Sequence, residues 1–593
     1  MGDVRPDGVP QDRRLDRRLF LERMGLLTAA AATGTAFAPP RLEGALAGLR
    51  PVTLPAPSGI QATEPWSMTV AELAALIREG ALSPAELVES YLRRVEAMDG
   101  ALQAFNTVTA AEARREARRL EGASWSGPLH GIPLAIKDNY YTRGVRTTAN
   151  SHIYADFVPD FDATAWERLR SGGAILLGKT QMGPLATSRA TTPDGVSTTR
   201  NAWAPHDPAV DPGGSSSGSA TAVAARMAAS STGTQTGGSI TNPSSRQGLT
   251  GIKPTMGRVS LHGIIPLTYT RDHPGPLARD AKDAALMLQQ MAGPDPRDPR
   301  TLGMPPVPDY ATAADPVRRG SETVLRWPTT IGILPGYLDQ ADQDDDFSGF
   351  PPREESSAQR DQRMRQAALR RAAEGEARRA MLATLEGVGA RVVEVELPPD
   401  WETLTSGNFN NVRLPERAEP FMEALRRDVR LFGVSLSPWI NGLLLSGPEY
   451  LRGQRAKMVL LQRVLDGIFS RCDVVVQTSP IPFDMIGLPL IAFPIGVEES
   501  RGTPLPLAGM MGGLPFGEER LLSLVAAYQA ETEWHRRRPA DPGTAGGEEG
   551  GAGGGRRGVR GDPAASSVGP TPGSRGPAPE HRLDVLDVME YGE

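Results

Sequence analysis

The sequence predicts an α/β fold built on a mixed β-sheet. Short apolar runs typical of buried strands alternate with amphipathic helix patterns along most of the chain. Two segments near residues 69 and 83 also carry the Ser/Thr-to-Glu spacing of a capping box, which begins a helix. The chain has 593 residues, of which 39% are hydrophobic, so it can bury a large core.

Two helices are predicted near the start of the folded part. Thr69 and Glu72 form a capping box, and Gly80 can end that helix. Ser83 and Glu86 repeat the same device for the next helix. Later helices are predicted at 283–293 and 519–537, and buried strands at 132–138, 173–180, 329–336, 390–398 and 490–496. A loop leading into a charged helix is predicted at 339–365.

The two ends of the chain have the composition of processing and linker segments. Residues 1–38 join Arg17 and Arg18 to a mildly apolar run that ends in small residues, as in a twin-arginine-like signal peptide. Export to the periplasm or outside the cell is therefore expected, with an undefined cleavage site. Residues 39–62 are predicted to be a linker, and the Gly/Pro-rich residues 540–593 a disordered tail.

Composition excludes several classes of function. The net charge of −6 argues against a general nucleic-acid-binding protein. A single cysteine, Cys472, excludes an intramolecular disulfide and a thiolate metal cluster, and we expect it to be a core residue at the start of a strand in "CDVVVQTSP". The seven histidines show no metal-binding spacing, and no stretch after the leader is apolar enough to cross a membrane.

The Gly/Ser-rich stretch 212–241 first suggests a flexible linker. A helix-forming run interrupts it, however, and a folded-looking segment follows it. Its glycines gather at two points, each followed by a serine: Gly213-Gly214 before Ser215, and Gly237-Gly238 before Ser239. Such glycines permit tight turns that direct backbone N–H groups into one space, as an oxyanion requires.

A serine nucleophile needs a base, and Lys137 is the candidate. It ends the apolar run 132–138, where desolvation can lower the pKa of a lysine. Periodicity alone favours the alternative of an ordinary strand-end lysine with its ammonium group in water. The residues by themselves leave these two interpretations open.

Several motifs together resemble the amidase signature family. They span about Trp66 to Pro539, which indicates a domain at 63–539, and are "GIPLAIKD", "GKTQMGPLA", "GGSSSGS", "GTQTGGSITNPSSRQGLTGIKPTMGR", "GPLARDAKDAALML" and "GLPLIAFPIG". The resemblance implies the amidase signature fold, a central mixed sheet flanked by helices on both faces. It also implies no metal and no cofactor.

The resemblance assigns roles to eight residues. Ser239 is the expected nucleophile, Ser215 the proton relay and Lys137 the neutral base. Ser215 is expected to follow a cis peptide bond from Gly214, and Ser216 to support Lys137 by hydrogen bonding. Backbone N–H groups of Ser239 and of three residues before it are expected to form the oxyanion hole: Thr236, Gly237 and Gly238.

The chain departs from the family pattern beside the nucleophile. The Asp of the family's "GTDxGGSIR" is Gln235 here, and its Arg is Thr241. Both partners of a charged pair are replaced together, so neither leaves an unpaired buried charge. Ser217 also replaces a glycine of the family's "GGSSGGS".

The resemblance implies an amidase that hydrolyses a small-molecule carboxamide, with esterase activity as a side reaction, and the predicted signal peptide makes it an exported one. The alternatives are the A subunit of a glutamyl-tRNA amidotransferase and a non-catalytic binding protein on the same fold. The predicted signal peptide argues against the former, and the intact triad against the latter.

Variable segments between about Tyr337 and Leu460 are expected to build the substrate pocket, and the sequence defines neither the amide nor the oligomeric state. Within them, three aromatic residues are predicted to be packing residues: Phe409, Phe432 and Trp439.

Overall fold

The computed structural model describes the main part of the chain, in four stretches: residues 53–59, 64–339, 357–499 and 502–543. The predicted signal peptide at 1–38 lies outside the described residues. So do most of the predicted linker at 39–62 and the predicted tail at 540–593, and much of the loop expected at 339–365. The fold below concerns the described residues alone.

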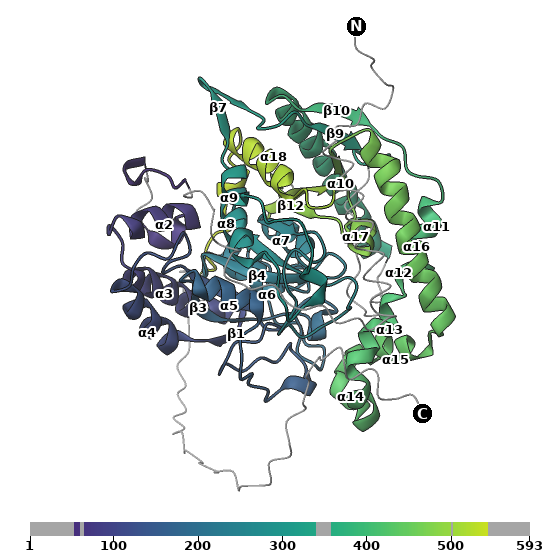
Figure 1. Ribbon diagram of the computed structural model, residues 1–593, viewed down its shortest axis with the longest axis horizontal. Coiled ribbons are helices and arrows are strands. Elements are labelled where there is room, and N and C mark those ends of the chain that lie inside the picture. Colours follow the sequence, from purple (N-terminus) through teal and green to yellow (C-terminus); the bar gives the residue numbers. More distant parts are fainter. Residues whose placement is uncertain (1–52, 60–63, 340–356, 500–501, 544–593) are drawn as a thin grey trace, which may run out of the picture. The chain divides into compact units, whose positions relative to one another are not determined.

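An eleven-stranded mixed sheet forms the centre of this part (Figure 1). Its strands, in spatial order, are β1 (Phe105–Val108), β3 (Ile175–Thr180), β2 (Pro133–Lys137), β4 (Ser230–Gln235), β6 (His273–Ala278), β5 (Thr250–Lys253), β12 (Leu490–Glu498), β13 (Leu505–Gly513), β11 (Val474–Val476), β9 (Thr330–Ile333) and β10 (Arg391–Glu394). Pairs β2–β3, β2–β4, β9–β10 and β9–β11 are parallel, and the other pairs are antiparallel. The predicted mixed sheet is therefore confirmed, including the strand expected after Cys472, which is β11, although β1, β4, β5, β6 and β13 were not among the expected strands. A separate hairpin joins β7 (Val317–Arg319) and β8 (Glu322–Val324).

Helices flank the sheet in groups. They are α2 (Val70–Arg78), α3 (Pro84–Leu102), α4 (Ala110–Glu121), α5 (Thr164–Ser171), α6 (Ser217–Ala224), α7 (Thr241–Gln247), α8 (Ala281–Met291), α9 (Tyr310–Ala313), α10 (Ser357–Gly387), α11 (Trp401–Thr405), α12 (Gly407–Asn410), α13 (Arg413–Ala418), α14 (Met422–Arg427), α15 (Leu436–Leu444), α16 (Gly447–Asp466), α17 (Ile481–Ile486) and α18 (Glu518–Ala530). Helices α6 and α7 pack on each other and on the strands, as do α8 and α18. Helices α11 to α16 gather on the green side of Figure 1, away from α2, α3 and α4.

Both predicted capping boxes are present. The side chain of Thr69 accepts from the N–H of Glu72, and the carboxylate of Glu72 accepts from the N–H of Thr69. Ser83 and Glu86 make the same exchange at the start of α3. Such caps satisfy N–H groups that have no partner inside a helix, which is why both helices begin where the sequence predicts.

The topology brings the predicted site residues to one edge of the sheet. Strands β2 and β4 are parallel neighbours, so their carboxyl ends lie together. Lys137 ends β2, and the chain after β4 leads through Ser239 into α7. Ser215 and Ser216 come immediately before α6, which packs on β2 and β4. No helix in the described part of the chain is long and apolar enough to span a bilayer.

Candidate active site

Lys137 is fully buried, so the interpretation of a solvated strand-end lysine is wrong. Its side chain has no exposed surface. The Nζ atom lies 2.8 Å from the Ser215 Oγ, 2.8 Å from the Thr234 Oγ1 and 3.3 Å from the Thr234 carbonyl oxygen. Each of these partners is a neutral oxygen, so no carboxylate among the described residues contacts the amine directly.

Burial lowers the pKa of Lys137 well below the usual lysine value of 10.5, because desolvation disfavours the ammonium form. The more distant Asp272 carboxylate opposes this effect only in part. A neutral amine has two hydrogens and one lone pair. Thr234 offers two acceptor atoms for the hydrogens, so the lone pair can accept the Ser215 hydroxyl proton.

The peptide bond between Gly214 and Ser215 is cis, as the family resemblance implies. Gly214 is tightly enclosed, because a Cβ placed on it would lie 2.6 Å from the Arg189 Cα atom. Ser216 is also buried, but its partner differs from the expected one. Its hydroxyl donates to the carbonyl oxygen of Ser239 at 2.6 Å, so it ties the two serine loops together rather than contacting Lys137.

Ser239 lies in the turn between β4 and α7. Its side chain is 4% exposed, and its hydroxyl has no hydrogen-bond partner among the described residues. The turn is possible because Gly238 adopts a φ of +97°, in the left-handed region that favours glycine. The structure therefore places this hydroxyl on a tight turn whose Ser239 carbonyl oxygen is held by Ser216, the chain neighbour of Ser215.

Thr236, Gly237 and Gly238, which were expected to supply oxyanion-hole N–H groups with Ser239, lie in this turn. The N–H group of one of them already has an acceptor. The Gly238 N–H donates to the Asp484 Oδ2 at 2.8 Å, so it is already engaged, contrary to expectation. The Thr236 hydroxyl donates to Asp272, and the Thr236 carbonyl oxygen accepts from the Arg271 Nη2 at 2.9 Å. Gly237 is the half-buried residue of the turn. These hydrogen bonds leave the Thr236 N–H untouched, so the backbone N–H groups of Thr236, Gly237 and Ser239 remain the candidates for binding an oxyanion.

Gln235 replaces the family's Asp and bridges the nucleophile turn to Asp484. Its Oε1 accepts from the N–H groups of Ile240 and Thr241 at 2.9 and 2.8 Å. Its Nε2 donates to both carboxylate oxygens of Asp484, at 2.9 and 3.1 Å. Sequence reasoning missed Asp484. The available signal was a lone acidic residue within the apolar segment "PIPFDMIG".

Three cationic side chains lie near the carboxylates that hold the turn: Arg271, Arg413 and Lys253. Burial lowers the pKa of Arg271 to about 10, and the nearby Arg413 acts in the same direction. Both guanidinium groups donate to the Asn410 Oδ1, at 2.6 and 2.7 Å. Lys253 lies 3.5 Å from the Asp484 carboxylate. These positive charges offset the buried carboxylates Asp484 and Asp272.

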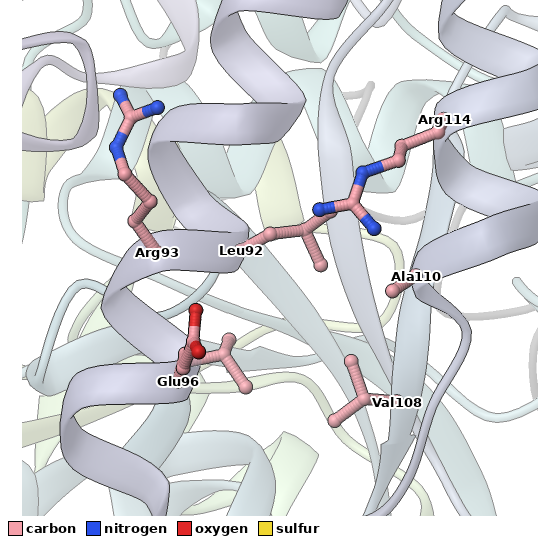
Figure 2. Close-up of a pocket in the computed structure, with 7 residues that line it drawn as sticks. Leu92, Arg93, Glu96, Val108, Ala110 and Arg114 are labelled. Carbon is pink, nitrogen blue, oxygen red and sulfur yellow. The ribbon is translucent and has the colours of Figure 1, made fainter.

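The described residues contain no cluster of three or more His, Cys, Asp or Glu side chains able to hold a metal ion. A separate hollow of about 440 Å³ lies between α3 and α4 (Figure 2). It is lined by Leu92, Arg93, Glu96, Val108, Ala110 and Arg114, among others. None of the triad candidates lines it, so it is not the candidate active site.

The residues predicted to pack do so. Phe432 and Trp439 are buried against Phe421, with ring centroids 6.2 and 5.1 Å from it. Phe409 is partly buried against the apolar cluster around α16. Cys472 is 1% exposed, as expected of a core residue.

These features gather serine and lysine side chains at one candidate site on an α/β sheet, and comparison with known proteins identifies the family. Residues 86–323 match the family described as Amidase. The A subunit of glutamyl-tRNA(Gln) amidotransferase from Moorella thermoacetica is 32% identical over 531 residues, which cover 80% of this chain and 99% of that protein. The chain therefore belongs to the amidase family.

Other relatives agree with this assignment. The A subunit of glutamyl-tRNA(Gln) amidotransferase from Roseiflexus sp. (strain RS-1) is 32% identical, over 80% of this chain and 98% of that protein. Among solved structures, the native peptide amidase from Stenotrophomonas maltophilia is 28% identical with a TM-score of 0.63, over 80% of this chain and 98% of that one. The chain is thus similar both to part of an amidotransferase and to a peptide amidase.

Proposed function

We propose that this protein hydrolyses a carbon–nitrogen amide bond through Ser239, Ser215 and Lys137. The Ser239 Oγ attacks the carbonyl carbon while its proton passes through Ser215 to Lys137. The C–N bond then breaks, and the protonated nitrogen leaves as an amine or ammonia. Water hydrolyses the resulting ester by the same proton route and regenerates the Ser239 hydroxyl.

The observation that carries this proposal is the environment of Lys137. A base must be neutral at working pH and must reach the hydroxyl that it deprotonates. Complete burial without a carboxylate contact favours the neutral amine, and its Nζ lies 2.8 Å from the Ser215 Oγ. The intact hydrogen-bond pattern also argues against a purely non-catalytic binding protein.

Labelling with a fluorophosphonate probe tests the proposal. The Ser239 Oγ should displace fluoride from phosphorus, and mass spectrometry of the full chain should place the adduct on Ser239. The Ser239→Ala variant should not be labelled, and Lys137→Met should react at least about 100-fold more slowly, the lower size of a general-base effect. A folded wild-type protein that stays unlabelled, or is labelled equally without Lys137, would contradict the proposal.

A second candidate function is that of the A subunit in a glutamyl-tRNA amidotransferase, which the names of the curated relatives favour. The same residues would then release ammonia from an amide donor for transfer. The predicted twin-arginine-like signal at 1–38 favours an exported hydrolase instead, and we propose export on that pattern alone. Ammonia release from free glutamine, compared with release from a panel of peptide amides and aryl amides, separates the two candidates.

A further inference from the structure

Asp484 is bonded to the nucleophile turn at two points, and nothing in the triad chemistry uses it. It lies on α17, far beyond Ser239 in the sequence, and its side chain is fully buried. Its carboxylate accepts from the Gly238 N–H at 2.8 Å. It also accepts from the Gln235 Nε2 through both oxygens.

Asp484 reaches the backbone on both sides of Ser239, directly at Gly238 and through Gln235 at Ile240. Gly238 immediately precedes Ser239, and Asp484 holds its N–H directly. Ile240 immediately follows Ser239, and its N–H donates to the Gln235 Oε1, whose own amide nitrogen is held by Asp484. The backbone on either side of Ser239 is therefore fixed by one carboxylate.

The charge of Asp484 is balanced locally. Its Oδ1 lies 3.5 Å from the Lys253 Nζ, which also donates to the Leu488 carbonyl oxygen at 2.5 Å. Burial raises the pKa of Asp484, whereas Lys253, Arg271 and the hydrogen bonds from Gln235 and Gly238 lower it. The carboxylate thus has the partners that a buried anion needs.

From this geometry we propose that Asp484 is a positioning residue for the nucleophile Ser239, and that with Gln235 it replaces the charged pair that the family pattern has beside the nucleophile. In this chain the carboxylate stands at position 484, and residue 235 is an amide that bonds to it. A cation at position 241, where the family has Arg, is not needed because Gln235 is neutral. The Thr241 N–H and hydroxyl donate to the Gln235 Oε1 instead. This inference rests on the proposed function of Ser239.

An exchange of the carboxylate and the amide between the two positions tests the proposal in the full-length protein. In Asp484→Asn, the new amide nitrogen faces the Gln235 Nε2, donor against donor. In Gln235→Glu, two carboxylates of unchanged reach meet at the same place. The double variant Gln235→Glu/Asp484→Asn restores one carboxylate and one amide with both side-chain lengths kept, so the hydrogen bonds around the turn can form again with the direction reversed between the two side chains.

The rate of reaction with a fluorophosphonate is the first readout. We expect Asp484→Asn to lower the limiting inactivation rate about 10- to 100-fold, the size typical of lost supporting partners, and to leave probe affinity within about threefold. The double variant should recover to within about threefold of wild type. Asp283→Asn is the matched control, because Asp283 is another buried aspartate that accepts two backbone N–H groups, from Val70 and Ala71. That control should leave the rate unchanged.

Hydrogen exchange reads the same contacts without any catalysis. Peptides covering residues 235–241 should exchange faster in Asp484→Asn and return toward wild type in the double variant. If the wild type is labelled but the single variant reacts and exchanges like it, or if the double variant is no better than the single ones, Asp484 does not position the turn. If the wild type is not labelled, the proposed function fails, and faster exchange restored by the double variant still supports the positioning role.

Discussion

Two buried lysines on neighbouring parallel strands have opposite surroundings. Lys137 on β2 and Lys179 on β3 both have no exposed side-chain surface. Lys179 lies 3.2 Å from the Asp138 carboxylate and donates to the Tyr140 carbonyl oxygen at 2.8 Å. Lys137 contacts only the neutral oxygens of Ser215 and Thr234. The two sites differ chiefly in one carboxylate.

That difference separates a structural cation from a candidate base. Burial lowers the pKa of both lysines, but Asp138 opposes the effect at Lys179 through its charge and a hydrogen bond. At Lys137 the opposing carboxylate is the more distant Asp272. Burial alone is therefore not enough to keep a lysine neutral and able to accept a proton. The amine must also lack a carboxylate close enough to stabilise the ammonium form.

The same substitution at the two lysines should give the largest contrast in activity. Lys137→Met keeps the length of the side chain but removes the amine, so we expect a loss of about 10²- to 10⁴-fold in the rate of amide hydrolysis, as is typical for a lost general base. Circular dichroism should show a folded protein. Steady-state rates on the best amide of a substrate panel provide the measurement, and a loss below about tenfold would remove Lys137 from the mechanism.

The contrast also shows how far the sequence could lead. Alternating apolar runs predicted β2, β3 and the mixed sheet, and capping boxes predicted the starts of α2 and α3. Strand β4 was missed because "SSTGTQ" has no apolar pattern, although all its residues are buried, between β2 and β6 and against α6.

The site was predicted in the same uneven way. Motif resemblance named the triad candidates, whereas the contacts of Ser216 and Asp484 depend on long-range packing that no local pattern encodes. Periodicity even favoured a solvated Lys137. Its burial follows from the strands on either side of β2, which the sequence around it does not reveal.

Lys179→Met should act on stability instead. It leaves the buried Asp138 without its cation, and breaking a buried ion pair by removing one partner typically costs about 3–5 kcal/mol. Asp138 keeps its hydrogen bonds from Asn106 and Thr148, so the fold should persist at low temperature. Urea unfolding of the variant and of wild type measures the loss. If the two have the same midpoint, the Lys179–Asp138 pair contributes nothing and the contrast between the lysines is overstated.

Counted per pH unit, the smallest expected effect is a dependence of stability on pH that belongs to Lys137 alone. The folded-state pKa of Lys137 lies below the unfolded value of 10.5. Between those two values the unfolded chain binds a proton that the folded chain does not, so this lysine makes wild-type stability rise with pH, by up to about 1.4 kcal/mol per pH unit. Lys137→Met lacks that contribution, while Lys179 and Lys253 contribute to both proteins and cancel in the difference.

The difference in unfolding free energy, wild type minus Lys137→Met, should therefore increase with pH from the lowered folded-state pKa of Lys137 up to 10.5, and level off above 10.5. Its plateau above pH 10.5 reflects the lost hydrogen bonds and packing, because Lys137 is then neutral in both states, whereas its slope at lower pH counts protons. Urea titrations of both proteins at a series of pH values supply the slope. A flat difference across this range means that folded Lys137 is protonated like an ordinary lysine, and it would then share the condition of Lys179 rather than that of a base.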